Sequence, residues 1–332
     1  MFRRDLLKAC LAGAALWHGS GCSRRKTSGR QRLRVIASRR LSMSSLYLAH
    51  ELGYFNDAGF DLEVQQGATP LQSVAAIAGG KADVMFTALT VAFLNAVAKG
   101  LELKVVAGRE IASPTCGTAG AICGSSLTFP NGLADVRQLK GKRVAAGPSI
   151  GFSQFAVDAQ LESAGLSAKD ITPVTLSSAE AIAALVGGSI DAMVQHNDFE
   201  RDLTSLASGV VRTPGLAQVH PNFQYSHIYF GNTLLSADVE IGARFLGAYL
   251  RGVRDFALGK SPRFMEEFAT SNGLDAGEIK RVCRGTFTLD GAIDKQSLKL
   301  FAEWAYRGQY TPRVLNVPEI ADSRFLDSAH AI

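Results

Sequence analysis

Residues 79–85 read GGKADVM, and residues 187–193 read GGSIDAM. In both stretches a helical pattern of apolar residues stops at a pair of glycines, and an aspartate then precedes a short apolar strand. A helix, a glycine turn and a strand that recur in the same order indicate two similar α/β lobes. The alternative is a chance similarity between two unrelated βα units.

Strand and helix patterns alternate outward from these stretches. In the first half they predict strands at 33–37, 60–64, 83–86 and 103–107, with helices at 42–52, 71–78 and 91–98. In the second half they predict strands at 141–146, 171–176 and 190–194, with helices at 152–164 and 179–186. An aromatic-rich strand at 223–230 follows, and then helices at 245–258, 263–271, 276–284 and 295–306. This alternation predicts lobes built on mainly parallel sheets.

The first residues have the order of an export signal. A basic start, RRDLLK at residues 3–8, is followed by an apolar run at 9–17 and then by small residues. The basic start resembles the twin-arginine signal, although the general secretory route stays open. Residues 20–22, SGC, resemble a bacterial lipobox, with a glycine before them where a leucine-like residue is usual. We therefore expect residues 1–21 to be a signal peptide and Cys22 to become the lipidated first residue. The alternative is a plain secretory signal cut at the same place.

The positive charge of the chain is gathered near its N-terminus. The net charge is +5, but residues 1–34 carry +8, so the remaining body carries −3. A mildly acidic body has no electrostatic footprint for DNA or RNA, and we expect no nucleic-acid partner. Residues 22–32 are polar and basic, which predicts a flexible tether that is attracted to anionic headgroups. No apolar run reaches the roughly 20 residues needed to span a bilayer.

The cysteines and histidines do not have the spacing of a metal site. Cys116 and Cys123 lie seven residues apart, and an oxidising compartment would permit a disulfide between them, so this pairing stays open. Cys283 lies in a helical pattern and is expected to be a small buried apolar residue. The six histidines are scattered and there is no CxxC, so we expect neither a metal nor another cofactor.

Five groups of residues together resemble one family of exported proteins. They are residues 47–64 (YLAHELGYFNDAGFDLEV), 80–84 (GKADV), 103–107 (LKVVA), 139–145 (LKGKRVA) and 184–192 (ALVGGSIDA). In order and spacing they are similar to the bacterial periplasmic binding proteins of the nitrate, sulfonate, taurine and thiamine-precursor uptake systems, over about residues 33–310. One departure follows: residues 195–198 read QHND, where many relatives carry an aromatic–acid–Pro group. No ligand residue is carried over from the family at that point.

The resemblance implies an α/β fold, that of a two-lobe periplasmic binding protein of type II-like architecture with a ligand cleft between the lobes. Lobe 1 is then expected to comprise residues 33–114 and 228–332, including the C-terminal helices, and lobe 2 residues 115–227. The chain is expected to cross to lobe 2 near residues 112–121 and to return near residues 222–231.

The resemblance also implies a function. We expect an exported, lipid-anchored, monomeric solute-binding protein of an ABC importer, which captures a small polar solute, organic or inorganic, and works with a permease and an ATPase. Its expected place is the periplasm or the outer face of the cell membrane, and which membrane holds the anchor stays open. One alternative is an enzyme on the same fold, related to the synthesis of thiamine-pyrimidine precursors, and another is an exported ligand sensor. The sequence has an export signal and no evident Ser-His-Asp spacing, paired carboxylates or nucleotide loop, so we expect no catalysis.

Ligands of such sheets bind beyond the carboxyl ends of the strands, where helices begin and present free backbone N–H groups. Four loops qualify, at residues 38–45, 67–70, 87–90 and 147–153, and they supply hydroxyl groups and small residues. The candidate ligand-binding residues are Arg39, Ser42, Ser44, Thr69, Thr87, Thr90, Ser149, Phe152, Ser153 and His196. For each serine or threonine the alternative is ordinary helix capping.

The charged and aromatic candidates also leave alternatives open. Arg39 and Arg40 suit an anionic ligand, because a guanidinium matches a carboxylate, sulfonate or nitrate, but adjacent arginines also commonly face solvent. His196 is either a hydrogen-bonding partner of the ligand or an ordinary loop histidine. Three residues alternate along one face of a predicted strand and either line the cleft or pack at the hinge: Tyr225, His227 and Tyr229. We expect a small polar ligand with an anionic or strongly accepting group.

We predict that Cys22→Ala releases the mature protein from membranes into the soluble exported fraction, because it removes the acylated residue. Cell fractionation followed by immunoblotting measures the shift. Cys10→Ala is the matched control and should leave the protein membrane-bound, since Lys8 lies too close before Cys10 for a lipobox. A membrane-bound mature form whose Cys22 is a free thiol by mass spectrometry would contradict the prediction.

Overall fold

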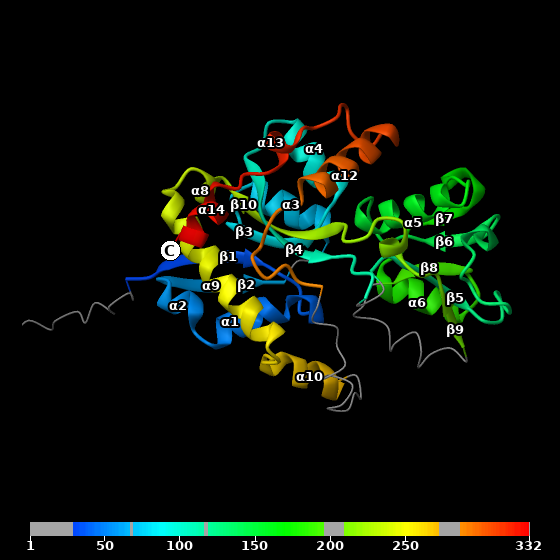
Figure 1. The fold of residues 1–332 in the computed structure, drawn as a ribbon, viewed down its shortest axis with the longest axis horizontal. Helices are drawn as coiled ribbons and strands as arrows, with labels where there is room; N and C mark the ends of the chain where they lie inside the picture. Colours follow the sequence, from blue (N-terminus) through cyan, green and yellow to red (C-terminus); the bar gives the residue numbers. More distant parts are fainter. Residues whose placement is uncertain (1–28, 67–68, 116–118, 196–208, 272–285, 332) are drawn as a thin grey trace, which may run out of the picture.

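The computed structural model describes residues 29–66, 69–115, 119–195, 209–271 and 286–331 (Figure 1). The strands of these residues form two five-stranded sheets, which lie in separate lobes at the left and right of Figure 1. Several sequence predictions fall outside the described residues: the signal peptide, Cys22, Cys116, His196, the helix at 276–284 and Cys283.

The first sheet has the strand order β2-β1-β3-β10-β4, and the second has the order β7-β6-β8-β5-β9. The strands of the first sheet are β1 (Gln31–Ile36), β2 (Phe60–Gln65), β3 (Val84–Ala88), β4 (Leu103–Ile111) and β10 (Gln224–Gly231). Those of the second sheet are β5 (Ala121–Ser125), β6 (Arg143–Ala145), β7 (Thr172–Val174), β8 (Ala192–Gln195) and β9 (Val210–Arg212). The sequence patterns predict eight of these strands and miss β5 and β9.

Both sheets are mixed: in each, four strands run in one direction, as the sequence pattern predicts, and one strand runs against them. β1 runs parallel to β2 and β3, but β10 is antiparallel to both β3 and β4. In the second sheet β6 runs parallel to β7 and β8, but β5 is antiparallel to both β8 and β9. β5 and β10 are the strands that follow the two passages between the sheets. In each sheet, the first strand after the chain has crossed from the other sheet is therefore antiparallel to both of its neighbours.

The helices cover the faces of the sheets, and most lie within a few residues of their predicted positions. The longer ones are α1 (Ser44–Glu51), α3 (Pro70–Ala78), α4 (Val91–Ala98), α5 (Phe152–Ser163), α6 (Ser178–Val186), α9 (Val239–Ala257), α10 (Arg263–Ser271), α12 (Lys295–Arg307) and α14 (Arg324–Ala331). The short ones are η1 (Leu41–Met43), α2 (Tyr54–Asp57), η2 (Val136–Leu139), η3 (Ala168–Asp170), η5 (Leu216–Gln218), α8 (Asn232–Leu235) and α13 (Val317–Ile320). Among the described residues, no helix is both long and apolar enough to cross a membrane.

The same contact between an arginine and an aspartate occurs in both lobes. In the first lobe Arg34 on β1 donates its backbone N–H to Asp83 at 2.8 Å, and its guanidinium donates to both carboxylate oxygens at 3.1 and 2.8 Å. In the second lobe Arg143 on β6 makes the same three bonds to Asp191, at 2.8, 3.1 and 3.2 Å. In return, each aspartate N–H donates to the carbonyl of its arginine. These are the aspartates of the two Gly-Gly stretches, so the sequence repeat marks a repeated contact.

The two lobes share one apolar core along α5. The ring of Phe155 lies 5.9 Å from Phe301 and 5.6 Å from Trp304, both on α12 of the first lobe. Trp304 Nε1 also donates to the carboxylate of Asp158 on α5 at 2.9 Å. Burial raises the pKa of Asp158, and this hydrogen bond only partly opposes that effect. The first helix of the second lobe is therefore packed against the first lobe as well as against its own sheet.

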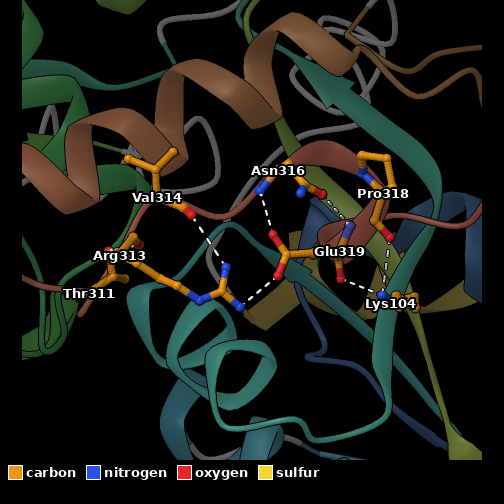
Figure 2. Close-up of polar contacts among 7 residues, drawn as sticks. All are labelled: Lys104, Thr311, Arg313, Val314, Asn316, Pro318 and Glu319. Carbon is orange, nitrogen blue, oxygen red and sulfur yellow. Dashed lines mark hydrogen bonds and ion pairs between the residues drawn. The ribbon is translucent and has the colours of Figure 1, made fainter.

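The C-terminal segment is held against β4 by polar contacts (Figure 2). Lys104 on β4 donates to the carbonyl oxygens of Pro318 and Glu319. Asn316 and Glu319 cap the start of α13 reciprocally, at 3.0 and 2.9 Å. Arg313 forms an ion pair with Glu319 at 2.6 Å. These contacts hold the end of the chain against a strand whose other end reaches the cavity described below.

The lobe boundary expected between residues 227 and 228 falls inside β10. Gln224 and the residues from Ser226 to Gly231 are paired in the first sheet. We therefore propose that the return passage ends before Gln224, so that β10 belongs whole to lobe 1. Similarly, residues 31–32 of the expected tether are the first residues of β1.

We predict that Asp83→Asn lowers the free energy of unfolding by about 2 kcal/mol and Asp191→Asn by about 1 kcal/mol. The order follows from exposure, since Asp83 is 3% exposed whereas the Arg143–Asp191 pair is more open to solvent. Glu102→Gln, at an exposed site, is the control and should change stability little. Urea unfolding measures all three. Equal stability of Asp83→Asn and the parent would contradict the structural role of this contact.

The effect of Asp83→Asn should depend on pH. Burial acts to raise the pKa of Asp83, but the hydrogen bonds from Arg34 outweigh it and hold the pKa below its usual value. A carboxyl whose folded pKa is depressed stabilises the fold above its unfolded pKa of about 3.9 and loses that contribution as the pH falls through the folded pKa. The stability difference between parent and variant should therefore be full at pH 6 and shrink below about pH 4.

Candidate functional site

A cavity of about 370 Å³ lies between the lobes. The first lobe contributes the residues that follow β1, the ends of β3 and β4, and the start of β10. The second lobe contributes residues 146–153 and the start of α6. The cavity therefore lies at the carboxyl ends of the parallel strands, which is where the sequence places the cleft.

Seven of the ten predicted ligand-binding residues line this cavity: Ser42, Thr69, Thr87, Thr90, Ser149, Phe152 and Ser153. Arg39 and Ser44 are not among the lining residues, and His196 lies outside the described residues. Ser44 is fully buried, and its hydroxyl donates to the carbonyl of Leu41 at 2.6 Å, so it fastens η1 to α1. This hydrogen bond gives Ser44 a structural role away from the cavity.

The two adjacent arginines point in different directions. Arg40 lines the cavity, whereas Arg39 forms an ion pair with Glu267 and lies 5.9 Å from the ring of Phe264. Arg40 has extended backbone angles, φ −117° and ψ 158°, and successive side chains of an extended chain point to opposite sides. The sequence cannot tell which of the two adjacent arginines points into the cavity, because this depends on the backbone conformation.

Helix starts surround the cavity, and most of them are capped by their own side chains. Thr69 accepts from the N–H of Gln72 at the start of α3, and Thr90 accepts from the N–H of Phe93 at the start of α4. For these two threonines the capping alternative is therefore correct, although both also line the cavity. α5 differs, because it begins after Gly151 and has no side-chain cap. Its first backbone N–H, that of Phe152, instead donates to the carbonyl of Leu89.

A short backbone contact joins the lobes at the wall of the cavity. The N–H of Val91 donates to the carbonyl of Ile150 at 3.1 Å, and the N–H of Phe152 donates to the carbonyl of Leu89 at 2.9 Å. A Cβ on Gly151 would lie 2.8 Å from the Leu89 carbonyl oxygen, closer than real Cβ atoms come. The close approach of the lobes therefore requires a glycine at this position.

Aromatic rings form one wall of the cavity. Phe152 of the second lobe stacks on Tyr225 of the first lobe, with centroids 4.4 Å apart and planes at 20°. Tyr225 thus lines the cavity, but His227 and Tyr229 are fully buried away from it, and this settles the choice that the sequence left open for the three residues. Burial lowers the pKa of His227 to about 3, with a smaller contribution from Arg109, so this histidine is neutral.

Arg109 and Glu110 form a buried ion pair at the cavity wall, and neither is among the ligand-binding residues predicted from the sequence. Glu110 lines the cavity, and its carboxylate lies 3.5 Å from the guanidinium of Arg109, which is 1% exposed. Burial acts to lower the pKa of Arg109, but the neighbouring Tyr249 and Glu110 outweigh it, so the guanidinium stays charged. The pattern predicts a strand that ends at residue 107, whereas β4 runs to Ile111 and carries both residues to the cavity edge. Charged residues that follow an apolar strand pattern indicate a loop by sequence alone, and this is why the prediction stops short.

The described residues hold no group of three or more His, Cys, Asp or Glu side chains that could bind a metal ion. The Cys123 thiol lies 2.6 Å from Gln195 Oε1 in the second sheet. Because Cys116 is outside the described residues, the disulfide between the two cysteines stays an open prediction.

Comparisons with known proteins agree with this architecture. A family model described as NMT1/THI5 like matches residues 41–259, while no curated protein matches the chain. The alkanesulfonate-binding protein SsuA from Xanthomonas axonopodis pv. citri, solved bound to MOPS, is 22% identical with a TM-score of 0.69, over 87% of this chain and 97% of that one. The periplasmic nitrate-binding protein NrtA from Synechocystis PCC 6803 is 12% identical with a TM-score of 0.71, over 91% and 89% of the two chains.

An enzyme has the same fold. The desulfurization enzyme DszB is 14% identical with a TM-score of 0.65, over 91% of this chain and 99% of that one. At these sequence identities, the structural similarity shows the two-lobe fold of periplasmic binding proteins but does not identify the ligand.

We predict that Gly151→Ala destabilises the protein by about 1–3 kcal/mol, because the added methyl group clashes with the Leu89 carbonyl and forces the lobes apart. Gly247→Ala is the control: the site lies inside α9 with no atom within 4 Å of an added methyl group, so stability should stay equal or rise. Thermal unfolding of both variants measures the difference. Equal stability of Gly151→Ala and the parent would show that the lobes do not meet as closely as described.

Proposed function

The chain belongs to the NMT1/THI5-like family, and we propose that it is the solute-binding protein of an ABC importer, which holds a small polar ligand between its two lobes. The observation that carries this proposal is the cavity itself, because both lobes line it and their backbones meet at its wall. A ligand held there contacts both lobes at once, which is how binding energy closes a two-lobe receptor. SsuA and NrtA, which share the fold, are described as sulfonate- and nitrate-binding proteins.

The chemistry of the cavity favours a ligand with an anionic or strongly accepting group. Arg40 supplies a cation, and the start of α5, which has no side-chain cap, supplies partial positive charge. Ser149 and Ser153 add hydroxyl groups beside that start. The negative charge of Glu110 is offset by Arg109 behind it, so it does not dominate the cavity. The stacked rings of Phe152 and Tyr225, which also line the cavity, suit an apolar part of the ligand.

We propose that this receptor is exported and held at the membrane by a lipid on Cys22, with the body free in the periplasm or at the outer face of the cell membrane. A permease and an ATPase are its proposed partners, and a monomer is its proposed state. The basic tether supports the anchoring, because its cations add to the attraction of a single lipid site for anionic headgroups.

The enzyme alternative has less support from the cavity. The described lining residues supply hydroxyl groups, one guanidinium and one carboxylate, and include no histidine or cysteine. A serine nucleophile needs an adjacent base, and Glu110, the one carboxylate among the described lining residues, is paired with Arg109. Capture and release without chemical change is therefore the function that we propose.

Thermal-shift screening of the mature protein tests the proposal. The panel is MOPS, butane-1-sulfonate, taurine, nitrate, aromatic carboxylates and hydroxymethylpyrimidine. A ligand that binds the folded state alone raises the unfolding temperature in proportion to the logarithm of its concentration over its Kd. Recovery of the ligand unchanged after incubation separates a receptor from an enzyme. Conversion of the ligand, abolished by a substitution in the cavity, would support the enzyme instead.

We predict that Arg40→Gln weakens binding of the anionic panel members by about tenfold, because it removes a charge-assisted contact. Arg39→Gln is the matched control, since it removes the same charge one residue away at a site that does not line the cavity. Isothermal titration calorimetry measures both. Equal losses in the two variants would mean that the arginines act only through long-range charge.

A further inference from the structure

We propose that Ser226 is a ligand-binding residue that donates its hydroxyl hydrogen to the ligand, and that buried Arg109 is the positioning residue that turns this hydrogen toward the cavity. The inference rests on the proposed function of the cavity. It adds that the ligand presents an acceptor oxygen to Ser226, of the kind found in sulfonate, nitro, carboxylate or carbonyl groups. Ser226 lies on β10 between Tyr225 and His227 and lines the cavity although it is 2% exposed.

The direction of the hydrogen bond between the two residues is fixed by chemistry. Arg109 Nη1 lies 2.7 Å from Ser226 Oγ, and both atoms are buried. A guanidinium has donors and no acceptor, so it must donate to the serine oxygen. One of the two lone pairs of the serine oxygen is therefore taken by Arg109, and the hydroxyl hydrogen points away from the guanidinium, where another acceptor can take it.

Within the described part of the chain, the acceptor bonded to that hydrogen is a distant one. The carbonyl of Thr87 accepts from the Ser226 hydroxyl at 3.5 Å, which is long for an O–H···O bond with a usual length of about 2.7–2.8 Å. Ser226 and Thr87 both line the cavity, so an acceptor bound there can take the hydrogen at a better distance. A hydroxyl that already accepts from a cation is also a stronger donor, because the hydrogen bonds of a chain polarise one another.

Arg109 is held so that it cannot turn away from Ser226. Its Nη2 donates to the carbonyl of Ser42, which also lines the cavity, and lies 3.5 Å from the Glu110 carboxylate. The guanidinium lies 5.4 Å from the ring of Phe86. Glu110 balances the buried charge, which makes the arrangement tolerable in the interior, and it does not alter the direction of the bond to Ser226.

Two single variants test the role of Ser226. The probe is the member of the set MOPS, butane-1-sulfonate, taurine and nitrate that binds the parent most tightly. We expect Ser226→Ala to weaken it by about tenfold or more, because a donor to a charged or strongly accepting oxygen is lost. Ser44→Ala is the matched control: it removes another buried serine hydroxyl, on a residue that does not line the cavity, and should leave the Kd within about twofold.

A double-mutant cycle tests the role of Arg109. Arg109→Lys keeps the positive charge but removes the planar guanidinium, whose two terminal nitrogens donate to Ser226 and Ser42 at the same time. We expect it to weaken the probe in the parent and to have little further effect in the Ser226→Ala background, because it acts through Ser226. Equal effects in both backgrounds would overturn the positioning role.

The outcomes separate this inference from the proposed function. If Ser226→Ala lowers the unfolding temperature as Ser44→Ala does but binds the probe as tightly as the parent, Ser226 is structural and the inference is wrong while the receptor function stands. If the parent binds none of the four probes, the proposed function fails for this ligand class, and the inference falls with it.

Discussion

In each lobe an arginine on one strand holds, with its backbone N–H and its guanidinium, the aspartate that precedes the parallel strand beside it. Arg34 does this with Asp83, and Arg143 with Asp191. The contact sets which residues of the two strands lie side by side, and so it sets where both strands end. The loops that line the cavity leave from those ends. A change of register between the strands would move Arg40 and Thr87 in the first lobe, or Ser149 in the second, away from their neighbours.

The lobes are less independent than their separate sheets suggest. α5 packs its aromatic face on α12, and its first residues are hydrogen-bonded to the end of the first sheet. A single helix thereby forms part of the shared core and part of the cavity wall. Parting this helix from α12 would expose Phe155 and Trp304 and break the bond to Asp158.

Donor groups dominate the described part of the cavity. Arg40 supplies only donors, each serine hydroxyl of the lining can donate, and Ser226 accepts from Arg109, which turns its own hydrogen away from the guanidinium. Glu110 is the exception, and the neighbouring Arg109 compensates its charge. Such a lining supports the ligand that we propose, which carries an acceptor group. The stacked rings of Phe152 and Tyr225 add an apolar surface to the cavity.

The sequence by itself determined the α/β alternation, the two lobes, the family and the loops that line the cavity, because these depend on local periodicity, glycine stops and short motifs. It placed seven of ten candidate residues at the cavity. It did not distinguish Arg40 from Arg39, since that depends on which way an extended backbone turns, and it offered Ser44 as a ligand-binding residue, whereas packing buries Ser44 and it does not line the cavity. Only the tertiary structure decided that β5 and β10 run antiparallel, and that Arg109, Glu110 and Ser226 meet behind the cavity wall. These residues come from strands far apart in the chain, and no local pattern records which side chains a folded sheet brings together.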